Sequence, residues 1–146
     1  MGKVTINNIL VPVDFSDPGV KALTYAAQMA SLFDATVLMA YVIEPVPMPA
    51  EISMAAVYDP DIEDRALERL AMIGETHFTD CHRETPIILR GHAGTELVKC
   101  AQTQASDLIV LGTHGYTGLK HLLLGSTAEY VVRSAPCPVL TIRHDA

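Results

Sequence analysis

The part of the sequence best suited to bind an anion spans residues 112–127 and reads GTHGYTGLKHLLLGST. Gly112, Gly115 and Gly118 let the backbone approach a ligand closely and adopt positive φ angles. Successive N–H groups in such a turn can form an anion-binding concavity. Residues 125–127, Gly-Ser-Thr, then open a predicted helix, whose unpaired N–H groups and dipole also attract negative charge. Together these residues describe a phosphate cradle made of backbone, which needs few cations.

The same spacing also fits a purely structural role. Glycines after a strand are often turn residues, and Ser126-Thr-Ala-Glu129 reads as a capping box. A capping Ser stabilises a helix by about 1 kcal/mol, which explains Ser126 without any ligand. The stretch is neither a GxxxxGK(S/T) phosphate loop nor a dinucleotide fingerprint at the first strand. A phosphate cradle and a structural turn therefore both fit the residues at this point.

Five short apolar runs, rich in β-branched residues, must position this stretch. Continuous hydrophobicity suits strands that are buried on both faces of a parallel sheet. Strands that alternate with helices imply right-handed crossovers and an open α/β sheet with helices on both faces, a three-layer arrangement. Ligands bind such sheets beyond the carboxyl ends of the strands, which is where the glycine stretch lies. We expect strands at residues 9–13, 36–43, 86–89, 108–111 and 139–142.

Helical periodicity predicts four helices between these strands. The first begins at Asp17-Pro18, because a Pro in the first turn lacks an N–H that would have no partner anyway. The second and third cover residues 61–77 and 95–105, and the last runs from Ser126 to before Pro136. The expected core face of the first helix consists of Val20, Leu23, Ala27 and Ala30.

Composition limits the class of protein. The 146 residues are 49% hydrophobic and 18% charged, which predicts one folded domain over residues 1–146. A formal net charge of −7 argues against a generic nucleic-acid surface. No run approaches the roughly 18 apolar residues of a membrane span, so we expect no membrane partner. Three widely spaced cysteines without a CxxC pair fit a reducing compartment, and we expect the cytoplasm.

Residues 44–60 stand apart from this pattern. Their prolines exclude a regular helix at the start of the segment, and a connection this long is uncommon without a role. A surface loop over the sheet and a lid or partner-binding segment both fit, so the segment stays unassigned.

The chain resembles the universal stress protein family, in its nucleotide-binding branch. That branch carries the motif G-x2-G-x9-G-(S/T) after its fourth strand, and here Gly112, Gly115, Gly125 and Ser126 match it without a gap. The opening segment ILVPVDFS, residues 9–16, and residues 96–143 are also similar to the family. The resemblance covers nearly the whole chain except residues 44–60.

The resemblance implies ATP bound at the carboxyl edge of a five-stranded parallel sheet in order 3-2-1-4-5, a Rossmann-like, adenine nucleotide alpha hydrolase-like fold. By position, Pro12, Val13 and Asp14 would lie beside adenine and ribose, with Asp14 close to the sugar or to Mg²⁺. Val42 would contact adenine through its backbone. An Asp after a strand also often caps the following turn, so Asp14 has a structural alternative. The candidate phosphate-side residues are Gly112, Thr113, His114, Gly115, Gly118, Gly125, Ser126 and Thr127.

His114 departs from the family pattern, since many relatives carry Arg at this position. A histidine is only partly charged at neutral pH, so ATP affinity is expected to rise from about pH 8 to about pH 6. His114→Arg is expected to remove that trend. Lys120 and His121 either compensate for the missing arginine or are solvated surface charges.

The leading functional hypothesis is a dimeric, ATP-binding stress or regulatory switch with an unknown protein partner. The resemblance implies a homodimer through the strand within residues 137–143, and a monomer whose terminal residues shield that edge is the alternative. No Gly-x-Ser-x-Gly elbow or Cys/His pair suggests a covalent nucleophile, so we expect no enzyme, or at most a slow Mg²⁺-dependent ATPase. A dimerisation module without nucleotide is a third hypothesis.

Overall fold

The computed structural model describes residues 2–16, 19–46, 49, 51, 59–113 and 124–143. Its strands are β1 (Asn8–Pro12), β2 (Thr36–Ile43), β3 (His82–Arg83), β4 (Ile87–Arg90), β5 (Leu108–Gly112) and β6 (Val139–Ile142). Its helices are α1 (Gly19–Phe33), α3 (Ile62–His77), α4 (Ala93–Thr103) and α5 (Ser126–Ser134).

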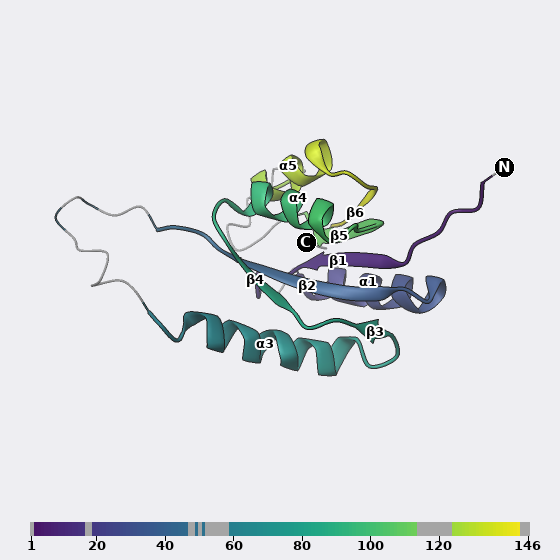
Figure 1. Cartoon of the computed structure of the whole chain (residues 1–146), viewed down its shortest axis with the longest axis horizontal. Helices are drawn as coiled ribbons and strands as arrows, with labels where there is room; N and C mark the ends of the chain where they lie inside the picture. Colours follow the sequence, from purple (N-terminus) through teal and green to yellow (C-terminus); the bar gives the residue numbers. More distant parts are fainter. Residues whose placement is uncertain are drawn as a thin grey trace.

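These elements form an open, fully parallel α/β sheet, as the alternating pattern predicts. The strand order is β3-β2-β1-β5-β6, and β4 also pairs with β2. Helices α4 and α5 lie on one side of the sheet and α1 and α3 on the other (Figure 1). The predicted fold class is therefore confirmed.

The third predicted strand is divided into two short strands, so the described part of the chain has six strands instead of five. β3 and β4 lie at the same edge, because Thr36 pairs with His82 and Ala40 pairs with Ile87. The Glu84 N–H still donates to the Val37 carbonyl at 2.9 Å, whereas Pro86 has no N–H to continue the ladder. The prediction of five strands in order 3-2-1-4-5 is corrected only in this count, since the order of the strand positions holds.

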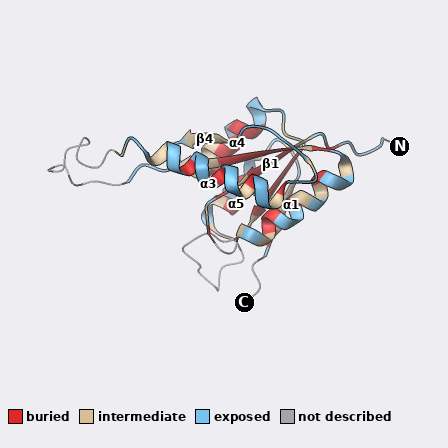
Figure 2. Ribbon diagram, turned by 90° about the horizontal axis from the view of Figure 1, so that it is seen from below, coloured by how far each residue is buried: buried red, intermediate tan, exposed pale blue. Residues whose placement is uncertain are grey.

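The core consists of two apolar layers, one on each face of the sheet. Along β1, Ile9 and Val11 pack toward α1 and α3, and Leu10 packs toward α4 and α5. Figure 2 shows the buried residues gathered along β1 and on the inner sides of the helices. Burial on both faces explains why the strands read as continuous apolar runs.

The core face of α1 differs from the prediction. Ala22, Leu23, Ala26 and Ala30 are buried, whereas Val20 is 47% exposed. Val20 lies in the first turn of α1, which starts at Gly19. The predicted helix start at residues 17–18 lies outside the described residues.

Candidate nucleotide-binding cleft

A cleft of about 670 Å³ opens at the carboxyl edge of the sheet, and ligand pockets are commonly of this size. The ends of β1, β2 and β5 form its floor, and α1, α3, α4 and α5 contribute to its walls. The structure brings together here every predicted site residue that it describes: Pro12, Val13, Asp14, Val42, Gly112, Thr113, Gly125, Ser126 and Thr127. The predicted site residues His114, Gly115 and Gly118 lie outside the described residues.

The start of α5 forms one end of the cleft and offers backbone donors. The Gly125 N–H donates to the Thr113 carbonyl at 2.6 Å, which ties the end of β5 to the start of the helix. The N–H groups of Ser126, Thr127 and Ala128 have no acceptor within the described part of the chain. These three residues line the cleft. Their unpaired N–H groups and the helix dipole create a site for negative charge.

The predicted capping box at this helix is wrong. Gly125 is the N-cap residue and Ser126 is the first residue of the helix, so the serine side chain does not cap it. Glu129 lies one position too late to reach back to the cap, and its Oε1 instead accepts a hydrogen bond from Arg133 at 2.6 Å. The structural role that explained Ser126 without a ligand is therefore absent.

Asp14 caps the turn after β1 and also faces the cleft. Its Oδ1 accepts hydrogen bonds from the Ser16 N–H at 2.9 Å and from the Ser16 hydroxyl at 2.5 Å. Oδ2 has no hydrogen-bond partner among the residues that the structure describes, and the side chain is exposed. The alternative role as a turn cap is thus correct, and it occupies only one of the two carboxylate oxygens.

Val42 offers backbone groups to the cleft because the strands end at different heights. The Ala40 carbonyl accepts a hydrogen bond from Val13 at 2.9 Å, whereas the Ile43 carbonyl accepts one from Gly91, beside β4. Backbone groups of successive strand residues point to opposite sides, so the N–H and C=O of Val42 point toward β1. Pro12 is the last β1 residue paired with β2, at Ala40. The Val42 donor and acceptor thus lie beyond the end of β1.

Sequence reasoning missed a stack of three side chains in the cleft wall. The Phe15 and Tyr41 ring centroids are 4.7 Å apart, and the Arg69 guanidinium lies 3.9 Å from the centre of the Phe15 ring. Phe15 has a φ of +61°, a strained conformation that costs on the order of 1–3 kcal/mol. No sequence pattern predicts this stack, because its three residues are far apart in the chain and come into contact only in the folded structure.

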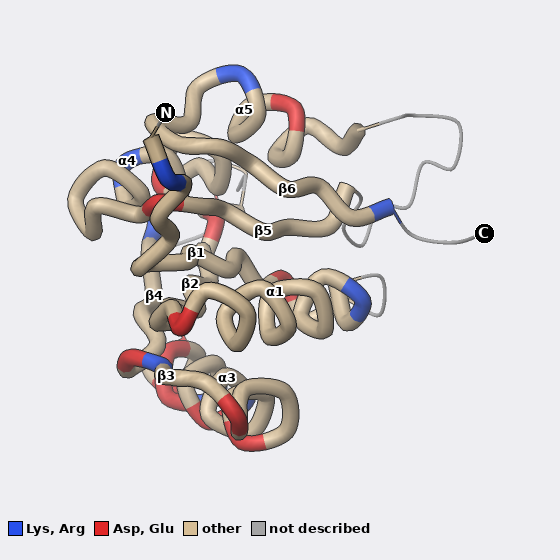
Figure 3. The backbone as a smooth tube through the Cα atoms, turned by 90° about the vertical axis from the view of Figure 1, so that its right-hand side faces the viewer, with Lys and Arg blue, Asp and Glu red and all other residues tan. Residues whose placement is uncertain are grey.

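The described walls of the cleft contain little positive charge. Among the described residues that line it, Arg69 is the only Lys or Arg, whereas Asp14 and Glu44 are acidic. Several further acidic residues lie along helix α3 (Figure 3). Within this described part, an anion would be held mainly by backbone N–H groups rather than by basic side chains.

A sequence profile of the universal stress protein family matches residues 5–143. The chain is 36% identical to universal stress protein MJ0531 of Methanocaldococcus jannaschii over 97% of this chain and 85% of that protein. The solved structure of MJ0577 from the same organism superposes with a TM-score of 0.84 at 28% identity, covering 97% of this chain and 99% of the other. For a universal stress protein of Lactobacillus plantarum the TM-score is 0.75 at 28% identity, with coverage of 97% and 100%.

More distant solved structures share the fold and contain adenine nucleotides. A universal stress protein in complex with cAMP has a TM-score of 0.67 at 23% identity, covering 97% of this chain and 99% of that one. An Arabidopsis thaliana family protein with AMP bound has a TM-score of 0.65 at 18% identity, covering 96% and 93%. The match over residues 5–143, together with the relative at 36% identity, shows that this chain belongs to the universal stress protein family.

Proposed function

We propose that this chain binds ATP in the cleft and acts as a nucleotide-dependent switch, as one domain spanning residues 1–146. The observation that carries the proposal is the set of N–H groups at Ser126, Thr127 and Ala128, which have no acceptor among the described residues and lie in the same cleft as the Asp14 carboxylate. A triphosphate would accept from the helix start, and the ribose hydroxyls would donate to Asp14. The cAMP and AMP complexes of family members support an adenine nucleotide as the anion.

Val42 supports the choice of adenine. Its N–H and C=O face the region beyond the end of β1, where none of the described strands pairs with them. An adenine ring carries a donor and an acceptor on one edge and would match this pair. On the phosphate side, His114, Gly115 and Gly118 are proposed to complete the cradle, together with Gly112, Thr113 and Gly125. As a switch, the protein would change between two conformations. ATP would shift the balance between them only by the difference in its affinity for the two conformations.

The first test identifies the bound molecule. The protein is purified without added nucleotide and denatured, and the released small molecules are analysed by mass spectrometry. Calorimetry with ATP, ADP, AMP and GTP, each with and without Mg²⁺, then gives affinity and base preference. We expect adenine nucleotides to be released or to bind, and ATP to bind more tightly than GTP. A flat titration with adenine nucleotides at about millimolar concentration would contradict the proposal.

A slow Mg²⁺-dependent ATPase is the second candidate, and the observation in its favour is Oδ2 of Asp14, which has no hydrogen-bond partner in the part of the chain that the structure describes. Mg²⁺ commonly takes one or two carboxylate oxygens together with substrate phosphates, and Oδ2 of Asp14 fits this donor set. When bound, the ion would neutralise charge on the phosphates. Steady-state phosphate release that disappears in Asp14→Ala would support the enzyme, and bound but intact ATP would support the switch.

The cellular setting and assembly are also proposals. We place the protein in the cytoplasm as a homodimer that pairs through β6 and binds a further, unknown protein partner in a stress response. Cys81, Cys100 and Cys137 are all free thiols, which supports a reducing compartment. Over the described residues, no helix has the length and apolar character to cross a bilayer. A dimerisation module without nucleotide would instead show no released nucleotide.

A further inference from the structure

Phe15 combines a left-handed backbone with a place in the cleft wall. Its φ of +61° lies in a region that bulky residues rarely adopt. Across this residue, Oδ1 of Asp14 accepts from the N–H and the hydroxyl of Ser16. Phe15 is therefore the central residue of the turn that the hydrogen bonds between Asp14 and Ser16 close.

Among the contacts of the Phe15 side chain are those with Tyr41 and Arg69, which come from two other elements. Tyr41 of β2 packs against the ring at a centroid distance of 4.7 Å with an interplanar angle of 41°. Arg69 of α3 places its guanidinium carbon 3.9 Å from the ring centre. Within the described residues Arg69 forms no ion pair or hydrogen bond. Its guanidinium instead makes a cation–π contact with the Phe15 ring.

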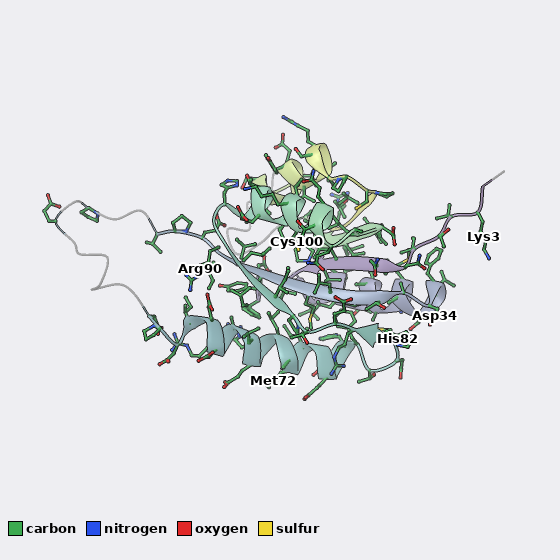
Figure 4. All side chains as sticks on the ribbon, in the orientation of Figure 1. Lys3, Asp34, Met72, His82, Arg90 and Cys100 are labelled. Carbon is green, nitrogen blue, oxygen red and sulfur yellow. The ribbon has the colours of Figure 1, made fainter. Side chains whose placement is uncertain are left out.

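Helix α3 is attached to the sheet on both sides of Arg69. Toward its start, Glu63 pairs with Arg90 at 2.7 Å, and Figure 4 shows Arg90 on β4 above the first turns of α3. Toward its end, Arg83 of β3 donates to the carbonyls of Gly74 at 2.9 Å and Phe78 at 3.2 Å. Arg69 therefore extends toward Phe15 from a helix that is bonded to the edge of the sheet near both of its ends.

We propose that Arg69 is a positioning residue for recognition of the nucleotide's sugar. By holding Phe15 against Tyr41, it keeps the turn from Asp14 to Ser16 closed and presents the Asp14 carboxylate to the ribose hydroxyls. Arg69 acts through Phe15 and does not contact the nucleotide. This inference rests on the proposed nucleotide site and adds the residue that tunes its preference for a ribose.

The test compares ATP with 2′,3′-dideoxy-ATP, which lacks both sugar hydroxyls, by calorimetry. The wild type is expected to prefer ATP. In Arg69→Leu, ATP affinity is expected to fall about three- to tenfold while dideoxy-ATP affinity stays constant, so the preference shrinks. Arg69→Lys keeps a cation over the ring and should restore most of the preference. Arg65→Leu is the matched control, because Arg65 lies one turn earlier on α3 and pairs with Asp59 instead.

The Asp14→Ala background separates positioning from direct contact. This change should abolish the preference for ATP, and adding Arg69→Leu should then have no further effect on it. An equal loss for both nucleotides in Arg69→Leu would make Arg69 a phosphate ligand and overturn the proposal, as would unchanged affinities. A merely structural role would lower the thermal midpoint without changing the ratio of the two affinities.

The wild-type titrations distinguish this inference from the proposed function. If the wild type binds neither nucleotide, the proposed function itself fails. If it binds both equally, ATP binding stands, but Asp14 does not read the sugar and the role of Arg69 is refuted.

Discussion

Asp14 divides its two carboxylate oxygens between the fold and the cleft. Oδ1 accepts two hydrogen bonds from Ser16, while Oδ2 has no partner in the described part of the chain. Because the side chain is exposed, water can solvate the second oxygen at little cost. A cap that closes a turn and a group that meets a ligand can therefore be the same residue, so the two interpretations of Asp14 are compatible.

Ser126 allows the backbone donor to be tested separately from the side chain. Ser126→Pro removes the first N–H of α5, and proline is well tolerated at this helical position. Ser126→Ala removes only the hydroxyl. We expect Ser126→Pro to weaken ATP binding about tenfold or more, since a hydrogen bond to a charged group contributes about 1.5–3 kcal/mol.

Calorimetry on both Ser126 variants measures this difference, with far-UV circular dichroism as the check on folding. Ser126→Ala should lose clearly less affinity than Ser126→Pro. Equal losses would assign the binding to the hydroxyl, contrary to a cradle made of main-chain amides.

At the scale of elements, the sequence predicted the strands well and the helix ends less well. Strands that are buried on both faces are easy to recognise in a sequence, because nearly all of their residues must be apolar. The start of α5 at Ser126 was predicted correctly, but its N-cap was assigned one residue too late, because Gly125 and Ser126 are both residue types that cap helices. The division between β3 and β4 was readable in principle, since Pro86 lies at the break.

The cleft was predictable to the extent that it follows from strand ends. Asp14, Val42 and Gly112 meet because parallel strands end at one edge of the sheet. Phe15, Tyr41 and Arg69 were not predictable in this way. Their contact depends on how closely α3 approaches the turn after β1, and a local pattern carries no such information.

Gly94 provides a test of the packing between α4 and α5. A Cβ built on Gly94 would lie 2.8 Å from Cδ1 and 2.9 Å from Cγ of Tyr130. In a helix, Gly→Ala is ordinarily favourable, but here the ring must move. We expect Gly94→Ala to lower the free energy of unfolding by about 1–3 kcal/mol in urea denaturation.

The double variant with Tyr130→Ala reveals the cause. Removing the ring should abolish most of the penalty of Gly94→Ala, because residues in contact are energetically coupled. Additive effects of the two changes would mean that the ring does not restrict this position.

The molecule as a whole has a net charge of −7, so its field opposes a polyphosphate. In the described part, the first N–H groups of α5 provide a local site for negative charge in the cleft.

At the same scale, the sheet ends in β6, which pairs only with β5 among the described strands. The carbonyls of Pro138 and Ile142 accept hydrogen bonds from Ile109 and Thr113. Val139 and Thr141 therefore direct their N–H groups to the open edge.

Thr141→Pro tests the proposed homodimer at this edge. It removes an outward N–H and leaves the bonds to β5 intact, which edge strands tolerate. We expect the protein to change from dimer to monomer in sedimentation velocity, whereas Thr141→Val stays dimeric. A Thr141→Pro protein that remains dimeric would move the interface elsewhere, and a monomeric wild type would refute the homodimer.

The break at Pro86 has a consequence for how far such sheets can extend. Continuous fibres need two complementary edges on each molecule, and here one edge is the single strand β6 while the other is divided between β3 and β4. When the β6 edge pairs with its own copy about a two-fold axis, it is no longer available to a third molecule. The interrupted edge then remains outermost on both sides, where proline opposes the addition of another strand. Assembly through β6 would thus be self-limiting, and polymerisation would stop at the pair.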